Sequence, residues 1–275
     1  MRRLAVLGGL TVAVLGGSCA VNDAFPAPAP AQVSAPAAAS APRSYLDGET
    51  LILLARSVPR FPEPGSSLET ADHAASQRFR ALEDSDRWRL AQTHAEVRPH
   101  LAVQHFDCAL SARLAEDPPP VLVRLLTRSL RDAGVASNAA KDVGFRARPV
   151  VDDPARRACI RVDDDLRASA SYPSGHATVG ALWGLIMADV APDEAEAMIS
   201  IGQEIGISRA ICAVHYPADV AAGQALGQAI YDAIRDAPDY RADVAAARDE
   251  VARARTLRRI NPGCAAERAA LTQTP

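Results

Sequence analysis

The chain reads ASYPSGHATVGALWGLIMADV from Ala170 to Val190. Nearly every position from Ala177 onward is apolar, so a helix over 177–190 would be buried on all sides instead of along a single stripe. The segment Pro173-Ser174-Gly175 has the composition of a turn, which places the start of this helix near His176. The sequence therefore predicts that this is the most buried helix of the fold, with polar residues at its amino end.

The rest of the chain also carries helical patterns. Apolar residues are spaced among charges as in amphipathic helices, and two segments begin with proline, which suits the first turn of a helix. The alternation that predicts strands is absent over any useful length. We therefore predict an all-α, single-domain helical bundle, with further helices at 67–82, 84–97, 120–133 (ended by Gly134), 193–206 and 217–235.

The amino terminus has the order of a secretory signal. Arg2-Arg3 precedes an apolar run from Leu4 to Leu15 and the small residues Ser18-Cys19-Ala20. Residues 21–43 are rich in alanine, proline and serine, which favours a linker over folded structure. We expect a signal peptide over 1–20, a linker over 21–43 and one folded domain over 44–265, in a protein that is periplasmic or secreted. The alternative is a lipid anchor on Cys19.

Composition narrows the class of protein. The chain has 275 residues, 23% charged and 48% hydrophobic, which is enough for one sizeable core. Its formal net charge of −3 becomes −5 once Arg2 and Arg3 leave with the signal peptide, which argues against a nucleic-acid partner. No apolar run after the signal reaches the roughly 18 to 20 residues that span a bilayer. Whether the protein forms a homo-oligomer is left open by the sequence.

The cysteines point to disulfides. Four remain after the predicted signal peptide, an even number in a chain directed to an oxidising compartment. Their spacing is not that of zinc ligands, so no metal site is predicted from them. Two disulfides are expected, and three pairings are open among Cys108, Cys159, Cys212 and Cys264.

Several cations lie in segments that suit an anion site. Lys141 is the single lysine among 30 basic residues, and it opens the spacing Lys141-x6-Arg148-Pro149. Arginine offers forked donors and lysine a compact charge, and both bind tetrahedral oxyanions such as phosphate. A serine hydroxyl and a glycine that lets backbone N–H groups approach would complete the site. The predicted anion ligands are Lys141, Arg148, Ser174, Gly175 and Arg209.

Two histidines and one aspartate supply a catalytic pattern. His215 and Asp219 are four residues apart, with Pro217 between them at the start of a predicted helix. The carboxylate can reach back to the imidazole, fix its tautomer and leave the other ring nitrogen free to attack. His176 is available as the general acid. We interpret the remaining histidines as structural and the acidic runs 152–153 and 163–165 as solvated loops; those histidines are His73, His94, His100 and His105.

In order, the three blocks resemble the motif of the type 2 phosphatidic acid phosphatase superfamily: Lys141-x6-Arg148-Pro149, Pro173-Ser174-Gly175-His176 and Ser208-Arg209-x5-His215-x3-Asp219. The fuller stretches 170–176 and 208–212 are similar to those of the class A bacterial nonspecific acid phosphatases, which are secreted and helical. The likeness extends from about residue 50 to 235. Three positions depart from residues common in the family, and they bear on substrate preference: Val150, Ala177 and Tyr216.

The resemblance implies a role for each matching residue. His215 would attack phosphorus and form a phosphohistidine, with Asp219 orienting it. His176 would protonate the departing alkoxide and then activate water. The phosphoryl oxygens would be held by Lys141, Arg148, Arg209, Ser174 and the backbone of Gly175. This mechanism implies small phosphomonoester substrates, no metal and no cofactor. A mildly acidic optimum is expected, because His176 must be protonated while His215 keeps a free nitrogen.

Three other functions are compatible with parts of this pattern. A vanadate-dependent haloperoxidase has a similar anion site, but those enzymes are usually much longer chains. An integral-membrane lipid phosphatase shares the blocks but needs spanning helices. A non-catalytic periplasmic phosphate-binding protein would not require both histidines together with Asp219. The sequence therefore favours a secreted acid phosphatase.

Overall fold

The computed structural model describes residues 43–275, so the predicted signal peptide and nearly all of the predicted linker lie outside the described residues. Within this range every regular element is a helix, and the all-α prediction is confirmed. The α-helices are α1 (Gly48–Arg56), α2 (Ser67–Arg78), α3 (Asp86–Thr93), α4 (Pro99–Ala102), α5 (Asp107–Leu110), α6 (Pro120–Lys141), α7 (Pro149–Asp152), α8 (Asp164–Ala168), α9 (Gly175–Val190), α10 (Ala195–Ile211), α11 (Pro217–Ile234), α12 (Pro238–Thr256) and α13 (Cys264–Leu271). Short 3₁₀ helices cover Phe79–Leu82, Val103–Phe106 and Pro192–Glu194.

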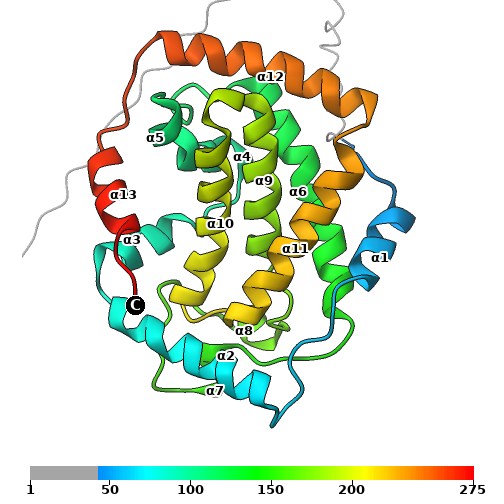
Figure 1. Cartoon of the computed structure of the whole chain (residues 1–275), viewed down its shortest axis with the longest axis vertical. Helices are drawn as coiled ribbons and strands as arrows, with labels where there is room; N and C mark the ends of the chain where they lie inside the picture. The colour runs from blue at the N-terminus through cyan, green and yellow to red at the C-terminus, as the bar shows by residue number, and fades with distance from the viewer. Residues whose placement is uncertain (1–42) are drawn as a thin grey trace, which may run out of the picture. The chain divides into compact units, whose positions relative to one another are not determined.

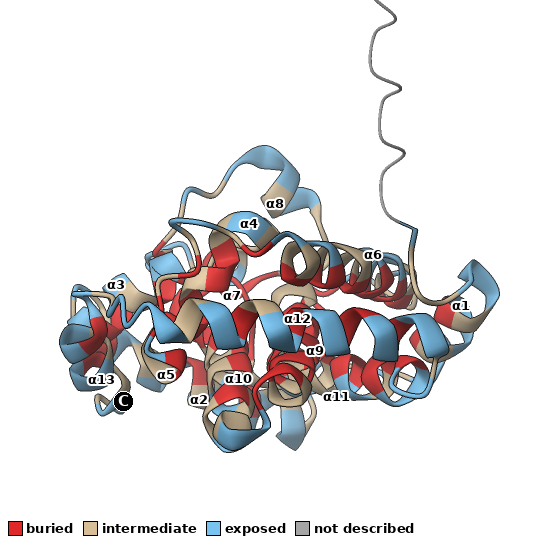
Figure 2. Cartoon of the chain, turned by 90° about the horizontal axis from the view of Figure 1, so that it is seen from above, coloured by how far each residue is buried: buried red, intermediate tan, exposed pale blue. Residues whose placement is uncertain are grey.

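Helix α9 lies at the centre of the described domain, between α10 and α11 (Figure 1). It begins where the sequence predicts, because the Ser174 hydroxyl caps it by accepting the N–H of Ala177 at 3.3 Å. Its apolar surface is buried nearly all round, and Figure 2 shows the buried residues concentrated on α9 and the helices beside it. Trp183 is fully buried and donates its indole N–H to Ser129 of α6 at 3.1 Å. Helix α9 is therefore buried as the sequence predicts.

Glycines allow α9 to approach its two neighbours closely. A Cβ added to Gly202 of α10 would lie 2.4 Å from the carbonyl oxygen of Gly180 in α9. A Cβ added to Gly223 of α11 would lie 2.3 Å from the carbonyl oxygen of Ser174. In both cases the added Cβ would meet a backbone oxygen, which cannot move aside as a side chain can. Any larger residue would therefore force the helices apart. The second contact seats α11 directly against the amino end of α9.

Helix α6 is longer than the sequence predicted. It runs through Gly134, where we expected it to stop, and ends at Lys141. A glycine inside a helix costs about 1 kcal/mol relative to alanine. The buried face nevertheless continues beyond it with Ala136, Ser137 and Ala140, and this burial outweighs the cost. The additional turns carry Lys141 to the end of α9 where His176 lies.

Other parts of the chain also differ from prediction, and the helix expected over 84–97 is the shorter α3, Asp86–Thr93. Helix α10 continues beyond Gly206, the expected end, to Ile211, because Gly206 packs closely on Ala177 of α9. Its last turn therefore carries Arg209. The acidic run 163–165, interpreted from sequence as a loop, begins the short helix α8, and the Asp163 carboxylate caps it by accepting the Leu166 N–H at 2.9 Å.

Two disulfides form, as expected, and the structure selects one of the three pairings. Cys108 pairs with Cys264 and joins α5 to α13, while Cys159 pairs with Cys212 and joins the segment before α8 to the end of α10. Among residues 43–275, no helix combines the length and the apolar character needed to cross a membrane.

Candidate active site

The predicted site residues come from helix ends that meet at the amino end of α9. Lys141 ends α6, Arg148 immediately precedes α7, and Arg209 lies in the last turn of α10. His215 lies just before α11, and Asp219 is in the first turn of that helix. The backbone N–H of Ser174 donates to the carbonyl oxygen of Asp219 at 2.9 Å, so the second and third sequence blocks are in direct contact.

His215 is held with its two ring nitrogens in different surroundings. Nδ1 lies 3.6 Å from Oδ2 of Asp219, and Nε2 lies 3.1 Å from Nη1 of Arg148. The carboxylate favours a proton on Nδ1, which leaves Nε2 as the unprotonated nitrogen. Burial lowers the pKa of His215 to about 4, although Asp219 acts in the opposite direction, and the charges of Arg148 and Lys141 lower it further. The site therefore presents a neutral imidazole whose unprotonated Nε2 accepts from Arg148.

Asp219 is fully buried and remains ionised because its oxygens are well supplied with donors. Oδ1 accepts from the guanidinium of Arg146, while Oδ2 accepts from the Ser171 hydroxyl at 2.5 Å and the Tyr216 N–H at 2.8 Å. Burial alone would raise the pKa of Asp219, but His215, Arg146 and Ser171 outweigh it and hold that pKa below its usual range. A carboxylate fixed in this way can orient the imidazole.

Arg146 is a site residue that sequence reasoning missed. One guanidinium nitrogen donates to Asp219 and the other to Asp72 of α2 at 2.6 Å, and the guanidinium carbon lies 4.2 Å above the ring of Tyr216. Its signal was its position inside the block Lys141-x6-Arg148. Ser171, also missed, lies within the stretch 170–176. Asp72 had no local signal, because only the folded chain brings α2 to this position.

Arg209 is buried with part of its hydrogen-bonding capacity unused. Its Nη2 donates to the carbonyl oxygen of Ala91 and approaches Sγ of Cys212 at 3.5 Å. Its Nε and Nη1 are also buried, and neither has a partner among the described residues. Leaving a buried charged donor unsatisfied costs about 1–3 kcal/mol or more. Burial, together with the charge of Arg87, lowers the pKa of Arg209 to about 9. Two free donors of this kind favour binding of an anion.

Lys141 and Arg148 hold the segment between α8 and α9. The Nζ of Lys141 donates to the carbonyl oxygens of Ala170 and Pro173 at 2.6 and 2.9 Å. Arg148 donates to the carbonyl oxygen of Leu166 at 3.0 Å and to the hydroxyl of Ser169 at 2.9 Å. Burial is the largest cause that lowers the pKa of Lys141 to about 8 and that of Arg148 to about 10. Both are cations at neutral pH, close to His215.

His176 lies in the first turn of α9, with Nε2 3.2 Å from the carbonyl oxygen of Ala95. Burial, followed by the charges of Arg209 and His215, lowers its pKa to about 3. The Ser174 hydroxyl is engaged as the cap of this helix, and the Cβ position of Gly175 faces the Ser137 side chain at 3.5 Å. The site therefore holds two neutral histidines among cations.

A model of the PAP2 superfamily matches residues 122–241, a range that contains all the predicted site residues. An acid phosphatase from Zymomonas mobilis is 34% identical over 196 residues, covering 71% of this chain and 74% of that protein. The chain belongs to the PAP2 superfamily. This confirms the resemblance drawn from the three blocks. Within the superfamily, non-specific acid phosphatases from Providencia stuartii and Salmonella typhimurium are 28% and 29% identical, covering 76% and 69% of this chain and 85% and 77% of theirs.

Proposed function

We propose that the protein is a periplasmic or secreted acid phosphatase that hydrolyses phosphate monoesters through a phosphohistidine on His215 and requires no metal ion. Within this proposal, residues 1–20 are the signal peptide, 21–43 the linker and 44–265 the phosphatase domain. The relatives named as acid phosphatases support the reaction class. The observation that carries the mechanism is the pair of His215 and Asp219, with the carboxylate behind Nδ1 and the guanidinium of Arg148 beside Nε2.

In the first step, Nε2 of His215 attacks phosphorus and the bond from phosphorus to the ester oxygen breaks. His176 gives its proton to the departing oxygen, so the leaving group departs as an alcohol. The negative charge of a bound phosphoryl group raises the pKa of His176 from its value in the free site, which makes this proton available. Asp219 stabilises the cationic phosphohistidine through Nδ1.

In the second step, His176 takes a proton from water, and the resulting hydroxide attacks phosphorus. The bond between phosphorus and Nε2 breaks, inorganic phosphate leaves, and His215 returns to its starting state. Cations hold the phosphoryl oxygens and the developing charge in both steps. In this assignment, the buried free donors of Arg209 bind those oxygens together with Lys141, Arg148, the Ser174 hydroxyl and the Gly175 backbone.

The test is hydrolysis of p-nitrophenyl phosphate by the mature protein at mildly acidic pH with a chelator present. We expect turnover that the chelator does not abolish and that His215→Ala eliminates. His100→Ala is the matched control, since His100 is exposed and lies in α4, which carries none of the proposed site residues. Phosphate binding without turnover would favour a binding protein, and vanadate-dependent oxidation of bromide would favour a haloperoxidase.

A further inference from the structure

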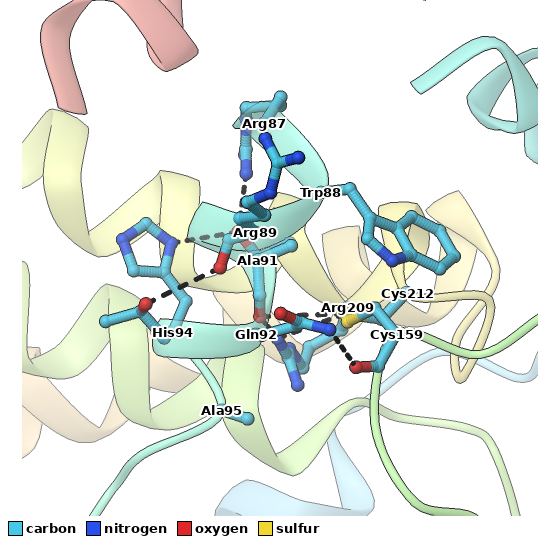
Figure 3. The surroundings of a disulfide bond; sticks show 12 residues. Arg87, Trp88, Arg89, Ala91, Gln92, His94, Ala95, Cys159, Arg209 and Cys212 are labelled. Carbon is cyan, nitrogen blue, oxygen red and sulfur yellow. Dashed lines mark hydrogen bonds between the residues drawn. A yellow bond between two sulfur atoms is a disulfide. The ribbon is translucent and has the colours of Figure 1, made fainter. Parts of the chain in front are cut away.

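The disulfide between Cys159 and Cys212 lies directly beside Arg209 (Figure 3). Cys212 is the first residue after α10 and is completely buried, and its Sγ is 3.5 Å from Nη2 of Arg209. The same nitrogen donates to the carbonyl oxygen of Ala91 in α3. Because Nε and Nη1 have no partner among the described residues, the sulfur and one carbonyl supply the hydrogen bonds that hold this guanidinium.

The apolar surroundings of the disulfide reinforce this dependence. Trp88 and Leu82 pack with Ile211 and Val214 around the two sulfurs in a small buried cluster, separate from the main core. Figure 3 shows the Trp88 ring from α3 beside Cys212 and Cys159. Helix α3, whose Ala91 carbonyl accepts from Arg209, therefore packs against the disulfide at the end of the helix that carries Arg209.

Cys159, the second cysteine of the disulfide, precedes the segment that accepts hydrogen bonds from Arg148. The carbonyl oxygen of Cys159 accepts from Nε2 of Gln92 in α3 at 2.9 Å. The chain then enters α8, where the carbonyl oxygen of Leu166 accepts from Arg148 at 3.0 Å. The hydroxyl of Ser169, just after α8, accepts from the same guanidinium at 2.9 Å. One covalent bond thus links the surroundings of two of the proposed phosphate-binding arginines.

We propose that the disulfide Cys159–Cys212 is a positioning element of the phosphate site, so that its loss weakens binding of inorganic phosphate and of phosphomonoesters. This inference rests on the proposed function of Arg209 and Arg148 as phosphate ligands. Without the bond, the end of α10 and the segment 159–170 can move apart, and Arg209 no longer keeps its position relative to Arg148. The disulfide acts through the two arginines and does not touch the substrate.

The second disulfide provides a matched control. Cys108–Cys264 closes a loop of sequence separation 156, against 53 for Cys159–Cys212. In the chain-entropy model the longer loop stabilises the fold more. Cys108 and Cys264 lie on α5 and α13, which carry none of the proposed phosphate ligands. Removal of this control bond should therefore cost at least as much stability while leaving the phosphate site intact.

The experiment compares Cys159→Ser/Cys212→Ser with Cys108→Ser/Cys264→Ser in the mature protein. The measurements are KM and kcat for p-nitrophenyl phosphate, the inhibition constant of inorganic phosphate, and the thermal midpoint. Losing one charge-assisted hydrogen bond corresponds to about a tenfold loss of affinity or more. We expect KM and the inhibition constant to rise by at least that factor in the first variant, and to stay within about twofold in the second, as for a site left unchanged.

Equal changes in the two variants, or an unchanged inhibition constant in the first, would overturn the proposal. If the first variant does not fold, the Cys108→Ser/Cys264→Ser protein can be titrated with a thiol, since Cys159–Cys212 is then its only disulfide. Phosphate binding should weaken on reduction and recover on reoxidation. If the unmodified protein has no turnover, the proposed function fails, but phosphate affinity measured by calorimetry still decides this inference.

Discussion

Replacing Arg146 by methionine removes the cation that lies between two buried carboxylates. The side chains of Arg146, Asp72 and Asp219 are 6%, 6% and 0% exposed, so water cannot replace the lost partner. Breaking a buried ion pair by removing one member costs about 3–5 kcal/mol. Here two carboxylates lose the same partner, and we expect the free energy of unfolding to fall by at least that amount at pH 7.

The same substitution should reduce catalysis through Asp219. Arg146 is one of the groups that hold the pKa of Asp219 low against the effect of burial. Without it that pKa rises, so Asp219 is protonated over part of the acid range and no longer orients His215. A loss of about 10²–10⁴ in kcat is typical when such a group is lost. KM should change less, because Arg146 is not among the proposed phosphate ligands.

The assay is the pH dependence of kcat and kcat/KM, combined with urea unfolding. In Arg146→Met we expect the acid limb of the kcat profile to move to higher pH. Arg156→Met is the matched control, since Arg156 is also buried but does not contact Asp219. Adding Asp72→Asn to Arg146→Met should recover stability but not kcat. An Arg146→Met protein that folds and keeps kcat within threefold, with an unshifted profile, would refute this reasoning.

Three further predictions follow from the buried histidines and the glycine contacts. The pKa values of four histidines are lowered, and desolvation is the largest cause for each, so the unfolded chain binds protons that the folded protein does not. Stability should fall as the pH drops from about 6.5 to 4, by about 1.4 kcal/mol per pH unit for each of His176 and His215. His94 and His105, whose pKa values are also lowered, should add to the fall, and chemical unfolding at pH 7 and pH 5 should detect it. Binding of phosphate should take up about one proton at pH 6, measured by calorimetry in buffers of different ionisation enthalpy. His176→Asn should abolish this proton uptake. Unchanged uptake in that variant would contradict the assignment of His176 as the general acid. Gly202→Ala should destabilise by about 1–3 kcal/mol or more, because its Cβ would lie 2.4 Å from a carbonyl oxygen, whereas Gly134→Ala, with open space around it, should stabilise by about 0.5–1 kcal/mol.

The sequence was most informative where burial and periodicity agree. The apolar stretch 177–190 and the proline at 217 predicted α9 and α11 nearly to their ends. Gly134 misled the prediction for α6, because a local helix preference is smaller than the burial of Ala136 and Ala140, which depends on the packing of other helices. Helix ends are therefore set by tertiary contacts as much as by local signals.

For the candidate site, too, the sequence revealed the residues that lie in local blocks and not those that only tertiary packing brings together. Residues in short local blocks, such as His215 and Asp219, could be found because four positions within one segment fix their relative placement. The partnership of Arg146 with Asp72 could not, because it depends on how α2 packs against the segment that precedes α7. The disulfide pairing was equally open to the sequence, since loop closure alone does not choose among three arrangements.

The proposed covalent intermediate can be tested directly by trapping it. His176→Asn should still react with p-nitrophenyl phosphate, since p-nitrophenolate leaves without a proton, but should hydrolyse the phosphoenzyme slowly. Rapid quenching followed by mass spectrometry of the peptide that contains residue 215 should then detect a phosphoryl group on His215 that is stable in alkali and lost in acid. A phosphoryl group on another residue, or turnover by His215→Ala at an unreduced rate, would contradict the assignment of His215 as the nucleophile.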